Sequence, residues 1–546
     1  MKTKTKYNLI ILSFLLLLSL LADEVRASEY DLSNGEVYVF DNVSATRNNV
    51  GKIDDAHFLN VYYDHSSGHV SAVILETNTV TGKLTATTPY EIDSTDFSSL
   101  NNVDIRVNQI QDSDYLITYR QAGGPRAVIL SVDTDSWTIS KGANHVLSDA
   151  WGLYDLQDTI KIDGNYFLTV YQGANWNGFG KILQIDVGSD TITEVSTVNL
   201  GAHSKENCLL SIDGQYFLNI STRSSNGGGR ILTVNESGGT ITQGSWQIFE
   251  SGFFWYSAAE KIDDTHYLVS YTGVDLKGWA ALLEVDTGSD SVALKNKFDF
   301  DEVRGFDNSL ERIDSDHVLS VFSGEGNQGW AVVLEVDTSS DVISKAAPNH
   351  MFDEALRTES VSSVQIDSDH YLVTYKGADG TGRAVILGLG IEPPKVDFNS
   401  KPEPVSVERK ADFILIQDES IEYYKYRING GEYSEVFPIS RPINLEGLAL
   451  GDYEIEVLGV NGYGIWQETP TNYFWQVTDK IDIIGTLYRS THIQETKHAL
   501  QKEKQRRICV YTPGGTEKDC DSTDDRAKFV LKGLDDGGDY ILYSSV

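Results

Sequence analysis

A thirteen-residue segment recurs along the chain, and this repetition constrains the fold more than any other feature. It reads KIDDTHYLVSYTG at 261–273, RIDSDHVLSVFSG at 312–324 and QIDSDHYLVTYKG at 365–377. The isoleucine in its second position occurs seven times, at Ile53, Ile110, Ile162, Ile212, Ile262, Ile313 and Ile366. Successive copies lie 50 to 57 residues apart, a period typical of repeat architectures in which each unit packs against its neighbours.

Each copy has the pattern of a small antiparallel sheet. Leucine stands six positions after the anchor isoleucine in every copy, and aromatic residues stand five and nine positions after it in most copies. Alternating β-branched and aromatic residues predict a strand, and apolar residues on both faces predict that neighbours cover it on both sides. Polar turns and a Gly-rich loop separate this strand from one short strand before it and two strands after it. Each copy therefore predicts four strands and no helix.

Seven such units predict an all-β fold, a seven-bladed β-propeller over residues 28–391. A β-solenoid has coils shorter than fifty residues, and separate sandwiches need about a hundred residues each. The seventh copy lacks a fourth strand, whereas a spare strand, GEVYVFDN, precedes the first copy at 35–42. We expect this N-terminal strand to pair into the last blade and close the ring.

Residues 1–27 have the features of a secretory signal peptide. Three lysines precede the apolar run LIILSFLLLLSLLA, and Val25-Arg26-Ala27 supplies small residues at the cleavage spacing. The run is shorter than the roughly 20 residues that span a bilayer, and no later segment is as long and apolar. We expect a secreted protein, extracellular or associated with the cell surface, with the periplasm as an alternative. No transmembrane segment is expected after cleavage.

Composition narrows the classes of partner. The formal net charge is −36, and such an acidic surface repels phosphate backbones, so we expect no nucleic-acid partner. The chain has three cysteines, too few for a disulfide scaffold. Cys509 and Cys520 could pair across a short loop, and Cys208 within NCLLSI would then be a buried apolar residue.

A Pro-rich stretch, EPPKVDFNSKPEP, separates the repeats from two further segments. Residues 392–480 contain YRINGG at 426–431, LALGDY at 448–453 and IWQ at 465–467. They resemble the immunoglobulin-like modules of secreted and surface bacterial proteins. Residues 481–546 contain STDD, KFVL and a following GL pair, and they resemble the carboxypeptidase-regulatory-like (transthyretin-like) β-sandwich. ETKHALQKEKQRR at 495–507 departs from that pattern and is interpreted as a charged helical or disordered insertion. Both resemblances imply spacers or weak binders.

The loops between blades and the Gly-rich loops lie on one face of a propeller, and here they concentrate aromatic, Arg and carboxylate residues. Flat rings beside planar hydrogen-bonding groups suit sugar rings, and they suit a protein partner as well. The candidate ligand-binding residues are Trp151, Tyr154, Asp158, His203, Glu206, Phe254, Trp255, Tyr256, Arg304, Glu354 and Arg357.

Other polar residues recur with the repeat and are therefore interpreted as scaffold. The Asp after the anchor isoleucine and the DTGSD-type turns could bind calcium, but Asx turns use the same residues, so we expect no metal or cofactor. His57, His266, His317 and His370 share one repeat position. The chain has no nucleophile elbow, zinc-spaced histidine set or phosphate-binding loop.

We predict a secreted, non-enzymatic binding or scaffold protein that recognises an extracellular carbohydrate or protein through one propeller face. Whether it is also an enzyme stays open. In the first alternative it is a glycosidase or lyase, with Asp158, Glu206 and Glu354 converging at the propeller mouth. In the second it is a structural component of the cell surface.

Overall fold

The computed structural model describes most of the chain beyond the predicted signal peptide, which lies outside the described residues. The described ranges are 29–93, 104–121, 124–147, 157–173, 177–202, 205–354, 358–486, 488–493, 497–502, 507–511, 517–522, 528–535 and 541–544. The chain divides into two compact units, the first comprising 1–392 with 462–464 and the second the remainder. No helix in these ranges is long and apolar enough to cross a membrane. The division of 392–546 into two modules stays a prediction.

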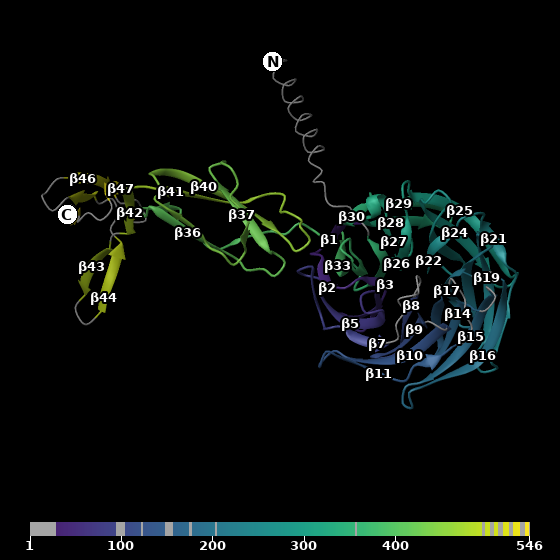
Figure 1. The fold of residues 1–546 in the computed structure, drawn as a ribbon. Coiled ribbons are helices and arrows are strands. Elements are labelled where there is room, and N and C mark those ends of the chain that lie inside the picture. Colours follow the sequence, from purple (N-terminus) through teal and green to yellow (C-terminus); the bar gives the residue numbers. More distant parts are fainter. Residues whose placement is uncertain are drawn as a thin grey trace, which may run out of the picture. The chain divides into compact units, whose positions relative to one another are not determined.

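The described residues of the first unit form seven antiparallel sheets, arranged around a centre in Figure 1. Four of them are β3 (Ala45–Lys52), β4 (His57–Asp64), β5 (His69–Asn78) and β6 (Lys83–Ala86) with β7 (Tyr90–Asp93); β8 (Ile105–Gln111), β9 (Asp114–Gln121), β10 (Gly124–Asp133) and β11 (Thr138–Lys141) with β12 (His145–Val146); β13 (Asp158–Asp163), β14 (Tyr166–Gln172), β15 (Asn177–Asp186) and β16 (Thr191–Ala202); and β17 (Lys205–Asp213), β18 (Tyr216–Arg223), β19 (Asn226–Asn235) and β20 (Thr240–Gln243) with β21 (Gln247–Glu250).

The other three sheets follow the same strand order. They are β22 (Trp255–Lys261), β23 (His266–Thr272), β24 (Gly278–Asp286) and β25 (Ser291–Asp301); β26 (Phe306–Arg312), β27 (His317–Ser323), β28 (Gly329–Asp337) and β29 (Val342–Lys345) with β30 (His350–Asp353); and β31 (Glu359–Gln365), β32 (His370–Lys376) and β33 (Gly382–Leu389) with the N-terminal β1 (Leu32–Asn34) and β2 (Tyr38–Asp41). A short 3-10 turn, η2 (Glu325–Asn327), lies in one Gly-rich loop.

The first strand of each sheet contacts the first strand of the next. These contacts run from β3 through β8, β13, β17, β22 and β26 to β31, and β31 in turn contacts β3. β1 and β2 both pair with β33, so N-terminal residues supply the strand that the seventh copy lacks. The all-β organisation is therefore propeller-like, as the repeat predicts.

The repeated residues form the packing between sheets. The leucine six positions after the anchor isoleucine is fully buried in every copy: Leu59, Leu116, Leu168, Leu218, Leu268, Leu319 and Leu372. The tyrosine nine positions after it can donate a hydrogen bond to an acid that ends the outer strand of the preceding sheet. Tyr119 Oη donates to Asp93 at 2.8 Å, and Tyr271 Oη donates to Glu250 at 2.6 Å.

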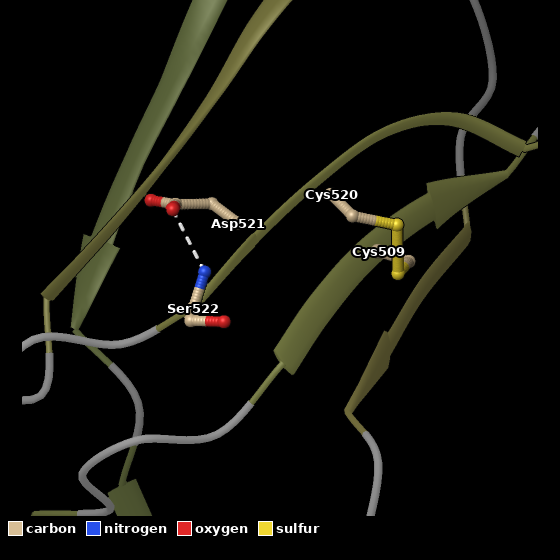
Figure 2. The surroundings of a disulfide bond; sticks show 4 residues. All are labelled: Cys509, Cys520, Asp521 and Ser522. Carbon is tan, nitrogen blue, oxygen red and sulfur yellow. Dashed lines mark hydrogen bonds between the residues drawn. A yellow bond between two sulfur atoms is a disulfide. The ribbon is translucent and has the colours of Figure 1, made fainter.

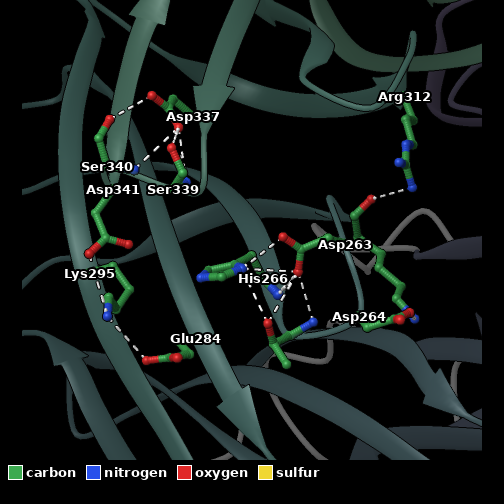
Figure 3. A network of polar contacts seen from close by, with 12 residues as sticks. Asp263, Asp264, His266, Glu284, Lys295, Arg312, Asp337, Ser339, Ser340 and Asp341 are labelled. Carbon is green, nitrogen blue, oxygen red and sulfur yellow. Dashed lines mark hydrogen bonds and ion pairs between the residues drawn. The ribbon is translucent and has the colours of Figure 1, made fainter.

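The recurrent Asp and His residues stabilise turns. Asp263 Oδ1 accepts the backbone N–H groups of Thr265 and His266 at 2.8 Å, and the His266 ring lies 2.8 Å from the same carboxylate (Figure 3). Asp54 and Asp314 repeat this arrangement with His57 and His317. The hydrogen bonds are those of Asx turns. Burial alone would raise the pKa of Asp263, but these hydrogen bonds lower it to about 2.

The second unit begins with two sheets that share one core. The sheets are β34 (Phe398–Ser400), β36 (Lys410–Leu415) and β39 (Ile443–Glu446), and β35 (Val405–Ser406), β41 (Thr471–Val477), β40 (Gly451–Val460), β37 (Tyr423–Ile428) and β38 (Phe437–Pro438). Phe413, Tyr424 and Trp475 are buried in the core between them. Their alternating apolar residues face one another, which is the packing of a β-sandwich.

The end of the chain forms small sheets. They comprise β42 (Lys480–Thr486) with β47 (Lys528–Asp535), β43 (Tyr488–Ile493) with β44 (Lys497–Lys502), and β46 (Glu517–Ser522), β45 (Arg507–Tyr511) and β48 (Ile541–Ser544). The interpretation of 495–507 as a helical or disordered insertion is wrong for β44, which pairs with β43. The β-branched and aromatic residues of β43 provide a partner strand, and pairing outweighs the local helix propensity.

Cys509 and Cys520 form a disulfide between β45 and β46 (Figure 2). They are directly opposite in the strand register, and their pairing is the one that the sequence leaves open. Cys208 is a free thiol, and burial raises its pKa above the ordinary value. It is partly buried and packs against the core beside β17, whereas the sequence predicts a buried residue.

Candidate functional site

Five of the first strands contain the same β-bulge, six residues before the anchor isoleucine. The strand register shifts there in β3, β17, β22, β26 and β31. The bulged residues have φ between 50° and 57° and are Arg47, Glu206, Tyr256, Asp307 and Ser360. Left-handed backbone costs a residue other than glycine about 1–2 kcal/mol, and a bulge re-aims its side chain. In each bulged strand, one side chain thus departs from the alternation of side chains between the two faces of the sheet.

Hydrogen bonds between neighbouring strands hold these bulges in place. Glu206 Oε2 accepts the backbone N–H of Tyr256, and Asp307 Oδ2 accepts that of Ser360, both at 3.0 Å. The Asn308 amide donates to the Tyr256 carbonyl at 3.0 Å. Glu206, Tyr256 and Asp307 are therefore each tied by a hydrogen bond to the first strand of the next sheet.

The bulged residues border an inner cavity of about 100 Å³ at the centre of the first unit. Its lining residues come from six first strands or the residue just before one, and they are Arg47, Asn48, Asp104, Ile105, Arg106, Glu206, Asn207, Tyr256, Ser257, Asp307, Asn308, Ser360 and Val361. Asp104 stands at the bulge position of the second copy and is 2% exposed. Its Oδ2 atom has no hydrogen-bond partner among the described residues. Most of the lining residues are polar, and Ile105 and Val361 are the apolar ones.

Burial and neighbouring negative charge raise the pKa values of the carboxyl groups in this cavity. Burial raises the pKa of Glu206 to about 8, and the charge of Asp104 adds to the rise. Burial also raises the pKa of Asp104 to about 6, although Arg47, 4.0 Å away, acts in the opposite direction. Both carboxyl groups therefore hold a proton to a higher pH than ordinary carboxyl groups do, Glu206 more strongly than Asp104. The site therefore offers both an acceptor and a carboxylic acid donor.

The Arg106–Asp158 ion pair adjoins this cavity. Arg106 Nε donates to Asp158 Oδ1 at 2.8 Å, and Asp158 Oδ2 accepts the backbone N–H of Leu209 at 2.7 Å. Both carboxylate oxygens of Asp158 are thus occupied by protein groups. Asp158 orients Arg106, which lines the cavity, and is not itself a lining residue.

An outer cavity of about 280 Å³ shares Arg47, Tyr256, Asp307 and Ser360 with the inner one. Its further lining residues are Thr46, Tyr63, His65, Arg304, Phe306, Glu359 and Lys376. The Arg304 guanidinium stacks 3.9 Å from the centroid of the Phe306 ring. The Phe306 ring lies 5.3 Å from that of Tyr256. A cation and two aromatic faces therefore stand beside the polar centre.

Trp255 extends these aromatic faces toward solvent. Its side chain is 42% exposed, and its ring lies 6.2 Å from that of Tyr256 and 4.1 Å from that of Phe253. Phe254, in contrast, is fully buried against Phe249 and Tyr271. The prediction that Phe254 binds ligand is wrong, because the ring fills the core between sheets.

The structure thus brings Glu206, Tyr256 and Arg304 together and places Trp255 beside them. Glu354 is exposed and lines neither cavity; its backbone carbonyl accepts a hydrogen bond from Gln328. The predicted convergence of Asp158, Glu206 and Glu354 is not observed, since only Glu206 is a lining residue. Four further candidates lie outside the described residues: Trp151, Tyr154, His203 and Arg357.

Sequence reasoning missed Arg47, Asp104, Arg106 and Lys376 as site residues. A signal for two of them was present in the repeat. Six residues before the anchor isoleucine the copies read Arg47, Asp104, Leu156, Glu206, Tyr256, Asp307 and Ser360. A position that changes its chemistry from copy to copy, within otherwise similar strands, indicates a role other than scaffold. Lys376 had no such signal in the sequence, because its position beside the outer cavity depends on how β31 and β32 pack.

No protein-family model matches the chain, and no curated protein matches its sequence. Several solved structures are similar in fold. A protein from Lactobacillus plantarum has a TM-score of 0.44 and 14% identity over 57% of this chain and 86% of its own. A putative 6-phosphogluconolactonase from Bacteroides uniformis has a TM-score of 0.42 and 13% identity over 55% and 83%. The extracellular domain of a putative hybrid two-component system from B. thetaiotaomicron has 0.36 and 10% over 81% and 57%. Similarities this distant leave ligand and activity to be argued from the chain's own residues.

Proposed function

We propose that this protein is a secreted binding protein that holds a sugar unit in the cavities at the centre of its first unit. The main support for this proposal is the set of residues at the bulge position of the first strands. It presents arginine, carboxyl, tyrosine and hydroxyl groups at a repeat position whose residue changes from copy to copy. Polyhydroxylated ligands need many donors and acceptors within a small volume, together with an aromatic face. A recessed polar site of this kind fits a small ligand better than a flat protein surface.

The wider architecture is inferred from the pairing and contacts already described. We infer that the seven sheets are the blades of a closed seven-bladed propeller, with β1 and β2 closing the ring. Residues 392–480 would be an immunoglobulin-like module and residues 481–546 a carboxypeptidase-regulatory-like module, both acting as spacers. Secretion is supported by the signal-peptide pattern of residues 1–27, and the disulfide suits an oxidising compartment.

A glycan array probed with the mature chain, residues 28–546, tests the binding function. We expect sugar binding that Glu206→Gln weakens about tenfold or more, because the amide replaces a positioned carboxylic acid. Glu354→Gln is the matched control, since Glu354 is exposed and lines neither cavity. Absence of binding to every glycan, or equal effects of the two substitutions, would contradict the proposal.

A second candidate is an enzyme that uses the same cavity. Its supporting observation is the pair of carboxyl groups with separated pKa values, about 6 for Asp104 and about 8 for Glu206. A general base and a general acid near neutral pH need such a separation. A turnover screen with chromogenic glycosides would show a bell-shaped pH profile that Asp104→Asn abolishes. Binding without turnover of any glycoside would exclude glycosidase activity on these substrates.

A further inference from the structure

The outer cavity differs in charge from the rest of this acidic chain. The whole chain has 80 acidic and 44 basic residues, excluding histidine. The cavity, however, is lined by Arg47, Arg304 and Lys376 against two acids, Asp307 and Glu359. Burial, and then the charge of Lys376, lower the pKa of His65, so this neighbour is neutral at pH 7. The balance in the cavity is thus slightly cationic where the average for the chain is strongly anionic.

Arg304 is the cation of this cavity that the protein neutralises least. In the part of the chain that the structure describes, its guanidinium forms no ion pair, and its buried Nε has no hydrogen-bond partner. Its backbone N–H donates to Asp301 Oδ1 at 2.9 Å, and its side chain lies flat on Phe306. The guanidinium thus packs on Phe306 and keeps an Nε donor that no described residue accepts. A planar guanidinium is suited to a carboxylate or sulfate.

Other donors lie around the same cavity. Lys376 Nζ donates to Glu359 Oε2 at 3.0 Å, and an ammonium has two further donors. Thr46 is 7% exposed, and its Oγ1 atom has no hydrogen-bond partner among the described residues. A cavity that keeps polar donors unpaired is arranged for a polar occupant, because burying them without a partner costs free energy.

We propose that the bound sugar is acidic. Its anionic substituent, a carboxylate or a sulfate ester, lies in the outer cavity against Arg304 and Lys376. Its hydroxyl groups reach the carboxyl and amide groups of the inner cavity, which shares Arg47, Tyr256 and Asp307 with the outer one. This inference rests on the proposed binding function and names the class of ligand.

Titration calorimetry of the mature chain at pH 7 tests the inference with five probes. The probes are glucuronate, galacturonate, galactose 6-sulfate, glucose and galactose. We expect at least one acidic sugar to bind ten times or more tightly than its neutral counterpart. The preference should decrease as salt is raised from about 0.05 to 0.5 M, because salt screens the pairing. The carboxylate and sulfate probes distinguish the two kinds of substituent.

Arg304→Gln should remove the preference for the acidic sugar, measured as the ratio of its affinity to that of the neutral sugar. Arg312→Gln is the matched control, since Arg312 ends β26, the strand that begins two residues after Arg304, and lines neither cavity. Circular dichroism and the unfolding midpoint check that each variant folds, and Lys376→Gln replaces Arg304→Gln if that variant does not.

Each outcome is decisive. Equal affinity for acidic and neutral sugars overturns the inference and leaves the proposed function intact. A preference that survives in folded Arg304→Gln also overturns it, as does equal binding of plain acetate or sulfate. Failure of every sugar to bind, here and on the glycan array, contradicts the proposed function itself.

Discussion

At the scale of single residues, recurring buried tyrosines stabilise the fold through hydrogen bonds between neighbouring sheets. Nine positions after the anchor isoleucine, a buried tyrosine can reach an acid of the preceding sheet, as Tyr119 reaches Asp93. Asp93 is 4% exposed, so a lost donor cannot be replaced freely by water. Tyr267 is also fully buried, but its hydroxyl has no hydrogen-bond partner among the described residues.

Tyr119→Phe should therefore destabilise the first unit by about 1–3 kcal/mol, because a buried carboxylate loses one of its donors. Tyr267→Phe makes the same chemical change and should be neutral or slightly stabilising, since an unpaired hydroxyl is removed. Urea denaturation of both variants measures the difference. Equal losses would show that the tyrosine–acid hydrogen bond contributes nothing beyond packing.

At the scale of elements, the first strands supply the residues of the site. They also contain buried carboxyl groups that should make the free energy of unfolding depend on pH. Two positions before the anchor isoleucine, Glu260 and Glu311 stand on the adjacent strands β22 and β26. Burial raises the pKa of Glu311 to about 8, and the charge of Glu260 adds to the rise. Burial raises the pKa of Glu260 to about 7. Both carboxyl groups thus bind protons more tightly in the folded than in the unfolded chain.

Stability from these groups is present below the unfolded pKa, about 4.5, and is lost as pH rises through about 7 to 8. We expect the free energy of unfolding to fall between pH 5.5 and pH 8.5. Glu311→Gln should reduce this fall by on the order of 1 kcal/mol, allowing for partial exposure. Glu302→Gln, at an exposed position, should leave it unchanged. Denaturation midpoints at the two pH values decide, and an unaltered fall in Glu311→Gln would contradict the assignment.

The turns between strands give another test at this scale. Asp263 accepts two backbone N–H groups and contacts the His266 ring. Asp263→Ala removes all of these interactions and should cost about 1–2 kcal/mol, whereas Asp263→Asn keeps the turn acceptor and should cost less than half as much. Thermal unfolding ranks the two variants. A larger loss in Asp263→Asn would assign the stabilisation to the charge of the carboxylate.

At the scale of the whole molecule, the N-terminal strands should stabilise the entire first unit. Phe40 in β2 is 6% exposed and contacts Gly382 of β33. A mature chain that starts at residue 43 would lose β1 and β2 and expose β33. We expect a loss of at least about 3 kcal/mol from Phe40 burial and ladder hydrogen bonds, with aggregation through the open edge.

Denaturation and sedimentation of this truncated chain measure both effects, and a synthetic 29–44 peptide should restore much of the loss. Removing 541–546, which contains β48 of the second unit, is the control and should leave the first unit's transition unchanged. A first unit that unfolds normally without β1 and β2 would show that the seventh sheet does not need them.

Much of the fold could be predicted from the sequence because it is written in local patterns. Strand periodicity, Asx turns and the anchor isoleucine can each be recognised within about ten residues. Comparing the copies then distinguishes recurring scaffold residues from residues that do not recur. Phe254 shows the limit of that comparison. It has no counterpart in the thirteen-residue segment, yet it is core packing, because the fold places its ring against Phe249 and Tyr271.

The candidate site was predictable only in part, for a physical reason. The sequence by itself determined the repeated strand pattern and, through it, the all-β, propeller-like organisation. Only the tertiary structure decided that Arg47, Asp104, Glu206, Tyr256 and Asp307 line one cavity. Those residues are up to about 260 positions apart in the chain, and their bulged backbone depends on hydrogen bonds from neighbouring strands. Repetition specifies each sheet locally, whereas convergence at the centre arises only when the sheets pack together.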